Sequence, residues 1–191
     1  MMVKVCGITN RKDALAAVDA GASAIGFNFY RESPRYISHT GAAMIAEKIP
    51  ANVWKVGVFV NEWPEMIARI VIDAGLDVVQ LHGSSEAIGV RIWAAVPASD
   101  PFGPLIENVE AVLIDSTDGI SGGSGKTWDW SQVPKFAQKI ILAGGLDADN
   151  VRAAIEQARP WGVDACSRIE RSPGLKDHEK MRKFVKAALE S

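Results

Sequence analysis

The sequence predicts a closed (β/α)8 barrel, a TIM barrel, formed by a single domain over residues 1–191. Short apolar runs alternate with longer runs at helical spacing, and eight such apolar runs occur. No G-x-G-x-x-G motif follows the first run, which argues against a doubly wound open sheet. The length of 191 residues lies just below the usual lower size of about 200 for this barrel.

Apolar or β-branched runs predict the eight strands, because parallel strands are buried on both faces. Polar residues and turn formers separate these runs. In chain order the predicted strands are Val3–Cys6, Ala24–Phe29, Trp54–Val60, Asp77–Leu81, Arg91–Val96, Ala111–Asp115, Lys139–Ala143 and Val163–Cys166.

Four of the intervening helices have ends that the sequence marks. Asn and Asp side chains cap helix N-termini, proline favours the first turn, and glycine ends a helix. These helices are expected over residues 10–21, over residues 64–75, from Asp147 onward and from Asp177 onward. Residues 97–110 are rich in proline and glycine, and Ser84–Gly89 holds barely one turn. We therefore expect the helix after the fifth strand to be missing and the fourth helix to be shortened.

The composition is that of a packed globule without a surface for nucleic acid or membrane. The chain is 48% hydrophobic and 23% charged, its net charge is -2, and its basic residues are scattered. No run approaches the about 20 apolar residues that span a bilayer, and no signal-peptide pattern opens the chain. The two cysteines lack a metal-ligand spacing. We expect a cytoplasmic protein without a metal site, either a monomer or a homodimer.

Two polar residues end predicted strands where a barrel enzyme carries its active site, at the C-terminal ends. Cys6 ends the first strand and Asp115 ends the sixth. Cys6 is either a small buried apolar residue or, if its pKa is lowered, a reactive thiolate. Asp115 is either a helix cap or a catalytic carboxyl group. A loop rather than an immediate helix follows it, which favours catalysis.

Candidate anion sites follow the second, seventh and eighth strands. Gly144 and Gly145 allow backbone N–H groups to approach an anion, and with Cys166 and Ser167 they match the phosphate position typical of such barrels. A packing role for the two glycines is the alternative. Arg35 lies in the loop after the second strand, where it is either a solvated surface charge or a paired donor for a carboxylate.

Alternation of side chains along strands predicts further neighbours. Lys4 shares its face with Cys6, and inside a barrel it would require a carboxylate partner such as Asp164. Because the eighth strand of a closed barrel pairs with the first, Cys6 and Cys166 are expected to be neighbours. The stagger between strands decides whether their sulfur atoms can bond. His82 is expected to orient the loop after the fourth strand.

Nine short motifs occur in an order that is specific as a set, although each is weak alone. Together they resemble the phosphoribosylanthranilate isomerase family of tryptophan biosynthesis over essentially the whole chain. The motifs are VKVCGIT (3–9), AIGF (24–27), SPRYI (33–37), VGVFVN (56–61), VVQLHG (78–83), LIDS (113–116), GGSGKTWDW (122–130), LAGGL (142–146) and PGLKD (173–177).

The resemblance implies an isomerase that rearranges N-(5'-phosphoribosyl)anthranilate to 1-(o-carboxyphenylamino)-1-deoxyribulose 5-phosphate without a cofactor. Asp115 would protonate the ring oxygen and Cys6 would remove the C2' proton. Arg35 would hold the anthranilate carboxylate, and Gly122–Gly125 would form a lid that excludes water. The residues expected to bind substrate are Arg35, Gln80, Gly144, Gly145, Asp164, Cys166, Ser167 and Arg168.

The chain departs from the family pattern at three positions. A small residue, often glycine, usually stands where this chain has Arg168, and serine or another small polar residue where it has Cys166. A basic residue is usual where it has Ala94.

Two alternatives remain open. A histidine-pathway isomerase performs the same rearrangement on a larger substrate, but its mechanism requires a carboxylate where this chain has Cys6. A catalytically silent barrel that binds phosphosugars is favoured by Arg168 and disfavoured by the joint presence of Cys6, Asp115 and Arg35.

Overall fold

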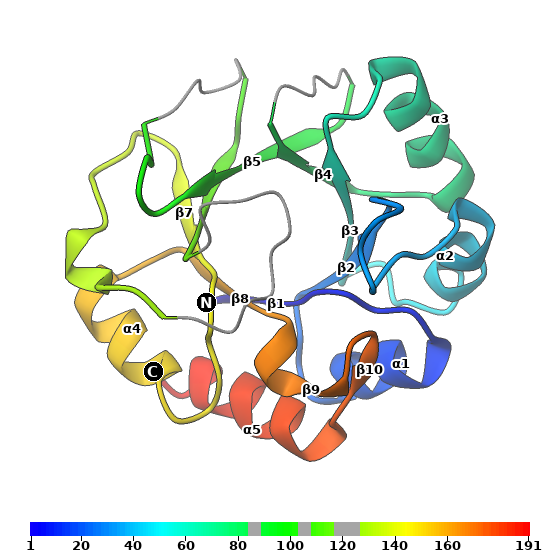
Figure 1. The fold of residues 1–191 in the computed structure, drawn as a ribbon. Helices are drawn as coiled ribbons and strands as arrows, with labels where there is room; N and C mark the ends of the chain where they lie inside the picture. Colours follow the sequence, from blue (N-terminus) through cyan, green and yellow to red (C-terminus); the bar gives the residue numbers. More distant parts are fainter. Residues whose placement is uncertain (84–88, 103–107, 117–126) are drawn as a thin grey trace.

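The computed structural model describes residues 1–83, 89–102, 108–116 and 127–191, which form a closed barrel (Figure 1). Eight parallel strands pair in chain order, and β8 pairs with β1 to close the sheet. The strands are β1 Met2–Val5, β2 Ala24–Asn28, β3 Trp54–Val60, β4 Val78–His82, β5 Arg91–Pro97, β6 Ala111–Asp115, β7 Lys139–Leu142 and β8 Gly162–Ala165. Each predicted strand is present with ends within one residue, so the barrel prediction is confirmed.

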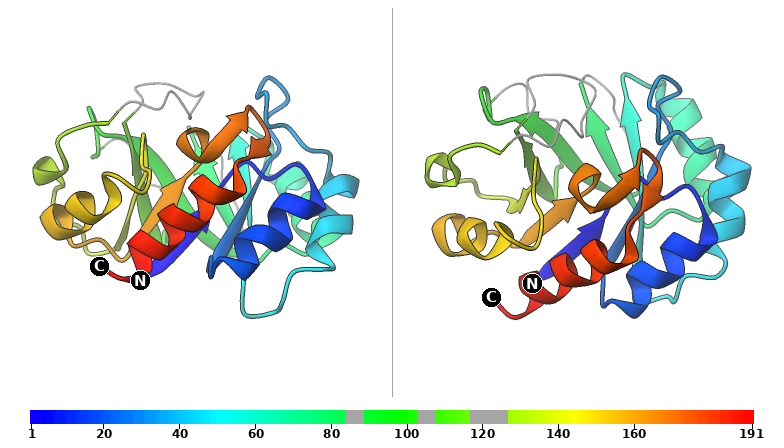
Figure 2. Two further views of the ribbon diagram at one scale, coloured as in Figure 1. Left: turned by 90° about the horizontal axis from the view of Figure 1, so that it is seen from below. Right: turned by 60° about the horizontal axis from the view of Figure 1, so that its bottom comes forward.

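The described residues contain five α-helices, which pack on the outside of the barrel (Figure 2). They are α1 Arg11–Asp19, α2 His39–Ala46, α3 Pro64–Ala74, α4 Val151–Ala158 and α5 His178–Leu189. The described part of the β5–β6 connection, residues 98–102 and 108–110, contains no helix, as predicted. The predicted short turn at Ser84–Gly89 lies, apart from Gly89, outside the described residues. None of the described helices is long and apolar enough to cross a membrane.

Three of the predicted helix ends are confirmed by their hydrogen bonds or backbone angles. The Asn10 side chain accepts from the backbone N–H of Asp13 at 2.9 Å, and Asp177 caps α5 in the same manner. Gly75 ends α3 in the left-handed conformation with φ 59°. Helix α2, capped by the Ser38 hydroxyl, had no predicted ends.

The start predicted at Asp147 for the helix after β7 is wrong. Helix α4 begins at Val151, four residues after Asp147. The Asp147 side chain instead accepts from the backbone N–H groups of Asp149 at 2.9 Å and Asn150 at 3.2 Å. An aspartate that bonds the backbone two and three residues ahead forms a turn as readily as a helix cap. Residues 147–150 form that turn.

The barrel interior is apolar at the N-terminal ends of the strands and polar at their C-terminal ends. Side chains alternate between the two faces of a strand, so every second residue faces inward. On β6 the inward residues pass from Ala111 and Leu113, which belong to an apolar interior cluster, to Asp115. On β4 they pass from Val78 in that cluster to Gln80. The strands thus deliver polar groups to one end of a packed barrel.

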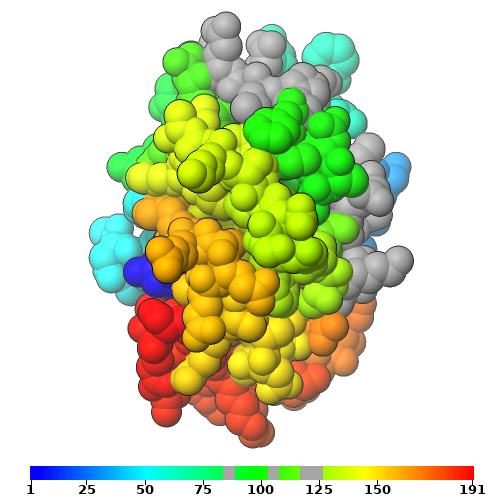
Figure 3. All heavy atoms as spheres, turned by 90° about the vertical axis from the view of Figure 1, so that its left-hand side faces the viewer, coloured from blue at the N-terminus to red at the C-terminus, as the bar shows by residue number. Residues whose placement is uncertain are grey.

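A second apolar layer lies between the strands and the helices. Figure 3 shows α4 and α5, in orange and red, on one side of the molecule, with the C-terminal helix covering the lower edge. The inward stripe predicted for this last helix is confirmed, since Met181, Phe184, Val185 and Ala188 are all buried. Phe184 is fully buried.

We expect the substitution Phe184→Ala to lower the free energy of unfolding by about 3–5 kcal/mol, because it removes a fully buried ring and leaves a cavity. Urea denaturation followed by circular dichroism measures this change. Lys183→Ala in the same helix is the matched control and should cost less than about 1 kcal/mol, because its side chain is 65% exposed. Equal losses for the two variants would contradict the packing assigned to α5.

Candidate active site

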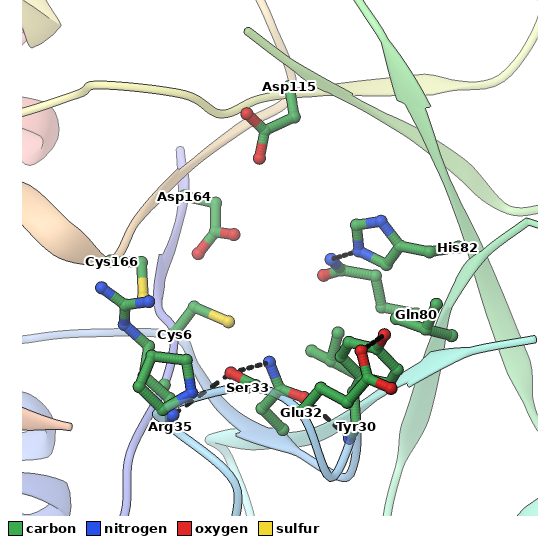
Figure 4. Close-up of a pocket in the computed structure, with 15 residues that line it drawn as sticks. Cys6, Tyr30, Glu32, Ser33, Arg35, Gln80, His82, Asp115, Asp164 and Cys166 are labelled. Carbon is green, nitrogen blue, oxygen red and sulfur yellow. Dashed lines mark hydrogen bonds between the residues drawn. The ribbon is translucent and has the colours of Figure 1, made fainter. Parts of the chain in front are cut away.

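A cavity of ≈ 230 Å³ opens at the C-terminal ends of the strands (Figure 4). Cys6, directly after β1, and Asp115, the last residue of β6, both face it from different sides. Arg35, Gln80 and Asp164 also line its wall. With Cys166, which also lines this cavity, the barrel brings together six predicted site residues from distant parts of the sequence.

A second cavity of ≈ 30 Å³ adjoins the first and shares Asp115, Asp164 and Cys166 with it. The remaining predicted binding residues line this smaller cavity, and they are Gly144, Gly145, Ser167 and Arg168. Each residue predicted for the site thus lies at one of the two cavities. Because they share three lining residues, the two cavities form adjoining parts of one site.

The Cys6 thiol is 9% exposed and lies among groups that favour its ionised form. A hydrogen bond from Cys166 and the charges of Lys4 and Lys176 hold the pKa of Cys6 well below the ordinary thiol value of 9.0, although burial opposes them. The same contact, together with burial, raises the pKa of Cys166. Of the two thiols, Cys6 is thus the one whose surroundings favour ionisation.

Lys4 and Asp164 form the ion pair that the alternation predicted. Lys4 Nζ lies 2.7 Å from Asp164 Oδ2 inside the barrel. Burial disfavours the charge on Lys4, but Asp164 and Cys6 outweigh it and raise the pKa of the amine. Burial, together with the negative charge of Cys6, raises the pKa of Asp164 to about 7. Its other oxygen, Oδ1, is buried and makes no hydrogen bond to the described part of the chain.

Arg35 is buried, so the interpretation as a solvated surface charge is wrong. Its Nε and Nη2 donate to both carboxylate oxygens of Glu170 at 2.8–3.1 Å. A guanidinium group has five N–H donors. Within residues 1–83, 89–102, 108–116 and 127–191, Nη1 makes no hydrogen bond, and Arg35 lines the larger cavity. The Glu170 contact therefore holds the side chain in place while leaving a donor edge for an anion.

Glu170, the carboxylate that holds Arg35, was not among the predicted site residues. Glu170 begins β9 (Glu170–Ser172), which pairs with β10 (Leu175–Lys176) in an antiparallel hairpin. Lys176 Nζ lies 2.7 Å from Glu170 Oε1, and both side chains are almost fully buried. Opposite charges on either side of the Pro173–Gly174 turn were the available signal, because a hairpin places such residues across from each other.

The Gly144–Gly145 turn after β7 has a packing requirement of its own. Both glycines have positive φ, at 85° and 65°. A Cβ atom at position 144 would overlap the backbone and hydroxyl of Ser116. Helix α4 begins only at Val151, so the glycine pair does not lie at a helix N-terminus. A helix dipole therefore does not strengthen the anion binding that was expected of the glycine N–H groups.

Three further expectations concern residues near the cavities. Arg168 forms an ion pair with Asp147, with Nη1 and Oδ2 2.9 Å apart. Ala94 is buried in the layer between strands and helices and does not face the cavity. Gln80 Nε2 lies 3.0 Å from Nε2 of His82. Burial and the charge of Lys4 lower the pKa of His82 to about 4. The neutral His82 ring therefore accepts a hydrogen bond from Gln80, a contact that was not predicted for it.

The lid expected at Gly122–Gly125 lies outside the described residues. The described segments contain no cluster of three or more His, Cys, Asp or Glu side chains that could hold a metal ion.

Comparisons with known proteins match the predicted family. The model of the family described as N-(5'-phosphoribosyl)anthranilate isomerase matches residues 3–187. A curated relative of that name from Solibacter usitatus is 48% identical, over 98% of this chain and 97% of its own.

Solved structures agree with the sequence matches. Phosphoribosyl anthranilate isomerase from Thermotoga maritima has a TM-score of 0.87 and 38% identity, with both chains covered fully. A further isomerase structure, with a TM-score of 0.81 and 35% identity over the whole of both chains, contains reduced 1-(o-carboxyphenylamino)-1-deoxyribulose 5-phosphate. The family found is the one that the motifs indicated, rather than its histidine-pathway sibling. This chain belongs to the N-(5'-phosphoribosyl)anthranilate isomerase family.

Proposed function

We propose that residues 1–191 form one catalytic domain that converts N-(5'-phosphoribosyl)anthranilate to 1-(o-carboxyphenylamino)-1-deoxyribulose 5-phosphate, a step of tryptophan biosynthesis. One observation carries the mechanism: the Cys6 thiol, whose pKa is lowered, and the Asp115 carboxyl group face one cavity from the ends of different strands. Acid and base groups on separate sides of a substrate can act on two of its atoms in turn.

Asp115 is the general acid. Its carboxyl proton goes to the ribose ring oxygen as the bond between that oxygen and C1' breaks, and the anilino nitrogen lone pair forms the iminium. Cys6 is the general base. Its thiolate takes the proton from C2', which the neighbouring iminium acidifies. The electrons of that C–H bond form the C1'–C2' double bond of the enol, and the π electrons of the iminium return to nitrogen. The enol then loses its hydroxyl proton and gains a proton at C1', which gives the ketone.

Two parts of the site suit the two anionic groups of the substrate. The donor edge of Arg35 suits the anthranilate carboxylate, because guanidinium binds carboxylates through paired donors. The small cavity suits the phosphate, with Gly144, Gly145 and Ser167 as backbone donors and Arg168 at its edge.

Two buried acceptors in the larger cavity suit the ribose hydroxyl groups. Gln80 Oε1 and Asp164 Oδ1 are buried and make no hydrogen bond to the described residues. A buried acceptor without a partner costs stability, which a substrate hydroxyl would recover by donating to it. Cys166 lines both cavities.

The chain is expected to act in the cytoplasm, as a monomer or a homodimer, and without a cofactor. Among the solved structures that it resembles is one of monomers generated from the dimeric isomerase of Thermotoga maritima, with a TM-score of 0.83.

The direct test of the function is the loss of substrate fluorescence when purified protein is mixed with freshly made N-(5'-phosphoribosyl)anthranilate. Mass spectrometry should identify the rearranged product. An intact, folded protein that leaves the substrate unchanged would instead support the catalytically silent barrel.

We expect Cys6→Ser and Asp115→Asn each to lower kcat by about 10²–10⁴-fold, the usual contribution of a general acid or base. Steady-state kinetics measures this loss, and circular dichroism verifies that the variants fold. A folded variant of either kind with more than about half of the parent activity would refute the role assigned to that residue.

Arg35→Ala should reduce kcat/KM by an amount equivalent to about 1.5–3 kcal/mol, mainly through KM, because it removes a charged hydrogen bond to the substrate. The loss should shrink for an analogue that lacks the aromatic carboxylate. Glu170→Gln is the control for positioning, since it keeps the guanidinium but loosens it. Equal losses of Arg35→Ala on both substrates would restrict Arg35 to a structural role.

The acid limb of kcat/KM should reflect Cys6, because activity is lost as pH falls through the pKa of the base. Since the pKa of Cys6 is lowered, that limb should lie well below pH 9.0. Lys4→Met removes a cation beside the thiolate and should move the limb to higher pH. Asp164→Asn removes an anion and should move the acid limb to lower pH or leave its position unchanged. Shifts of the same sign in both variants would contradict the electrostatic account.

A further inference from the structure

Cys6 and Cys166 are lateral neighbours on paired strands. Val5 of β1 pairs with Ala165 of β8, and the N–H of Cys6 donates to the carbonyl oxygen of Ala165 at 3.0 Å. The register therefore continues to Cys6 and Cys166, one residue past each strand. Neighbouring strands lie about 4.8 Å apart, and a disulfide needs Cα atoms about 4.4–6.8 Å apart. The stagger of the barrel does not separate this pair.

Both thiols lie on the inner face of the sheet. The ion pair of Lys4 and Asp164, two residues earlier on each strand, fixes the inward direction. Cys6 and Cys166 are both free and both line the larger cavity, where Figure 4 shows their side chains as neighbours.

Two glycines leave the space that the sulfur atoms fill. A Cβ atom at Gly26 on β2 would lie 2.7 Å from Cys6 Sγ, and one at Gly7 would lie 2.9 Å from Cys166 Sγ. A real Cβ is essentially never found so close to another heavy atom. Each sulfur therefore occupies space that a side chain larger than glycine would take.

We propose that Cys6 and Cys166 form a modification site at which a hydroperoxide converts the two thiols into an intramolecular disulfide. The bridge goes beyond the proposed function, whereas the loss of activity that it would cause rests on the proposed role of Cys6 as base. The family resemblance does not supply this site, because serine or another small polar residue usually stands at position 166.

The reaction balances with hydrogen peroxide as the oxidant. The Cys6 thiolate attacks one peroxide oxygen, the O–O bond breaks, and the products are a sulfenic acid on Cys6 and, after protonation, water. The Cys166 sulfur then attacks the Cys6 sulfur, the S–S bond forms, and the S–O bond breaks. The leaving hydroxide takes the Cys166 proton as water. The two thiols lose two electrons, and the peroxide gains them.

Nearby charges favour Cys6 as the attacking thiolate and Cys166 as the second sulfur. The charge of Lys4 favours the ionised form of Cys6. Lys176 Nζ lies 3.8 Å from Cys166 Sγ, where its charge stabilises the second sulfur as it loses its proton. Cys6 is therefore the peroxidatic thiol and Cys166 the resolving thiol.

The test treats the full chain with hydrogen peroxide and counts thiols after unfolding. We expect both thiols to disappear, the intact mass to fall by two hydrogen atoms, and non-reducing peptide mapping to link Cys6 to Cys166 within one chain. A sulfinic acid on Cys6 without a bridge, a link between two chains, or retention of both thiols would overturn the proposal.

Cys166→Ser is the matched control, and Cys166→Ala provides a second variant in case the first does not fold. Without the resolving thiol, Cys6 should proceed to the sulfinic acid. Dithiothreitol should then restore the oxidised parent to nearly all of its starting activity and leave the variant without most of its own. Equal recovery would contradict a protective bridge. A bridged parent that stays fully active would uphold the site and refute Cys6 as the base.

Discussion

The ion pair of Lys4 and Asp164 is the interaction on which the rest of the site depends. It joins the first and last strands of the barrel across 160 residues of sequence, at the seam where the sheet closes. Burying two charges is costly unless they are paired at short range, so any slip in the β1–β8 register is strongly disfavoured. The β1–β8 register that this ion pair stabilises places Cys6 beside Cys166 and close to the Lys4 amine.

A second group of buried charges, with three members, holds Arg35 in place. Glu170 lies between Arg35 and Lys176 and pairs with both. Removing one member of such a group leaves a buried charge uncompensated, which typically costs about 3–5 kcal/mol. The cations of the site, Arg35 and Lys4, are thus held by the carboxylates Glu170 and Asp164. These groups are in position before any substrate binds.

Much of this arrangement followed from local patterns in the sequence. Apolar runs located the strands to within a residue, and alternation along them paired Lys4 with Asp164. Other features depend on contacts that local patterns do not encode. The partner of Arg35 lies 135 residues away, so nothing near Arg35 marks it as buried. Asp147 was placed at a helix start because a turn and a helix cap use the same side-chain hydrogen bonds.

Closure of the barrel places Cys6 beside Lys4 and Cys166, which lowers the pKa of its thiol in the substrate-free protein. Alkylation by iodoacetamide measures this pKa directly, because only the thiolate reacts. The rate at Cys6, separated from Cys166 by peptide mapping, would be followed as a function of pH in the folded and unfolded chain. We expect a midpoint for folded Cys6 well below 9.0 and below that of the unfolded chain. A midpoint at or above the unfolded value would refute this effect of barrel closure.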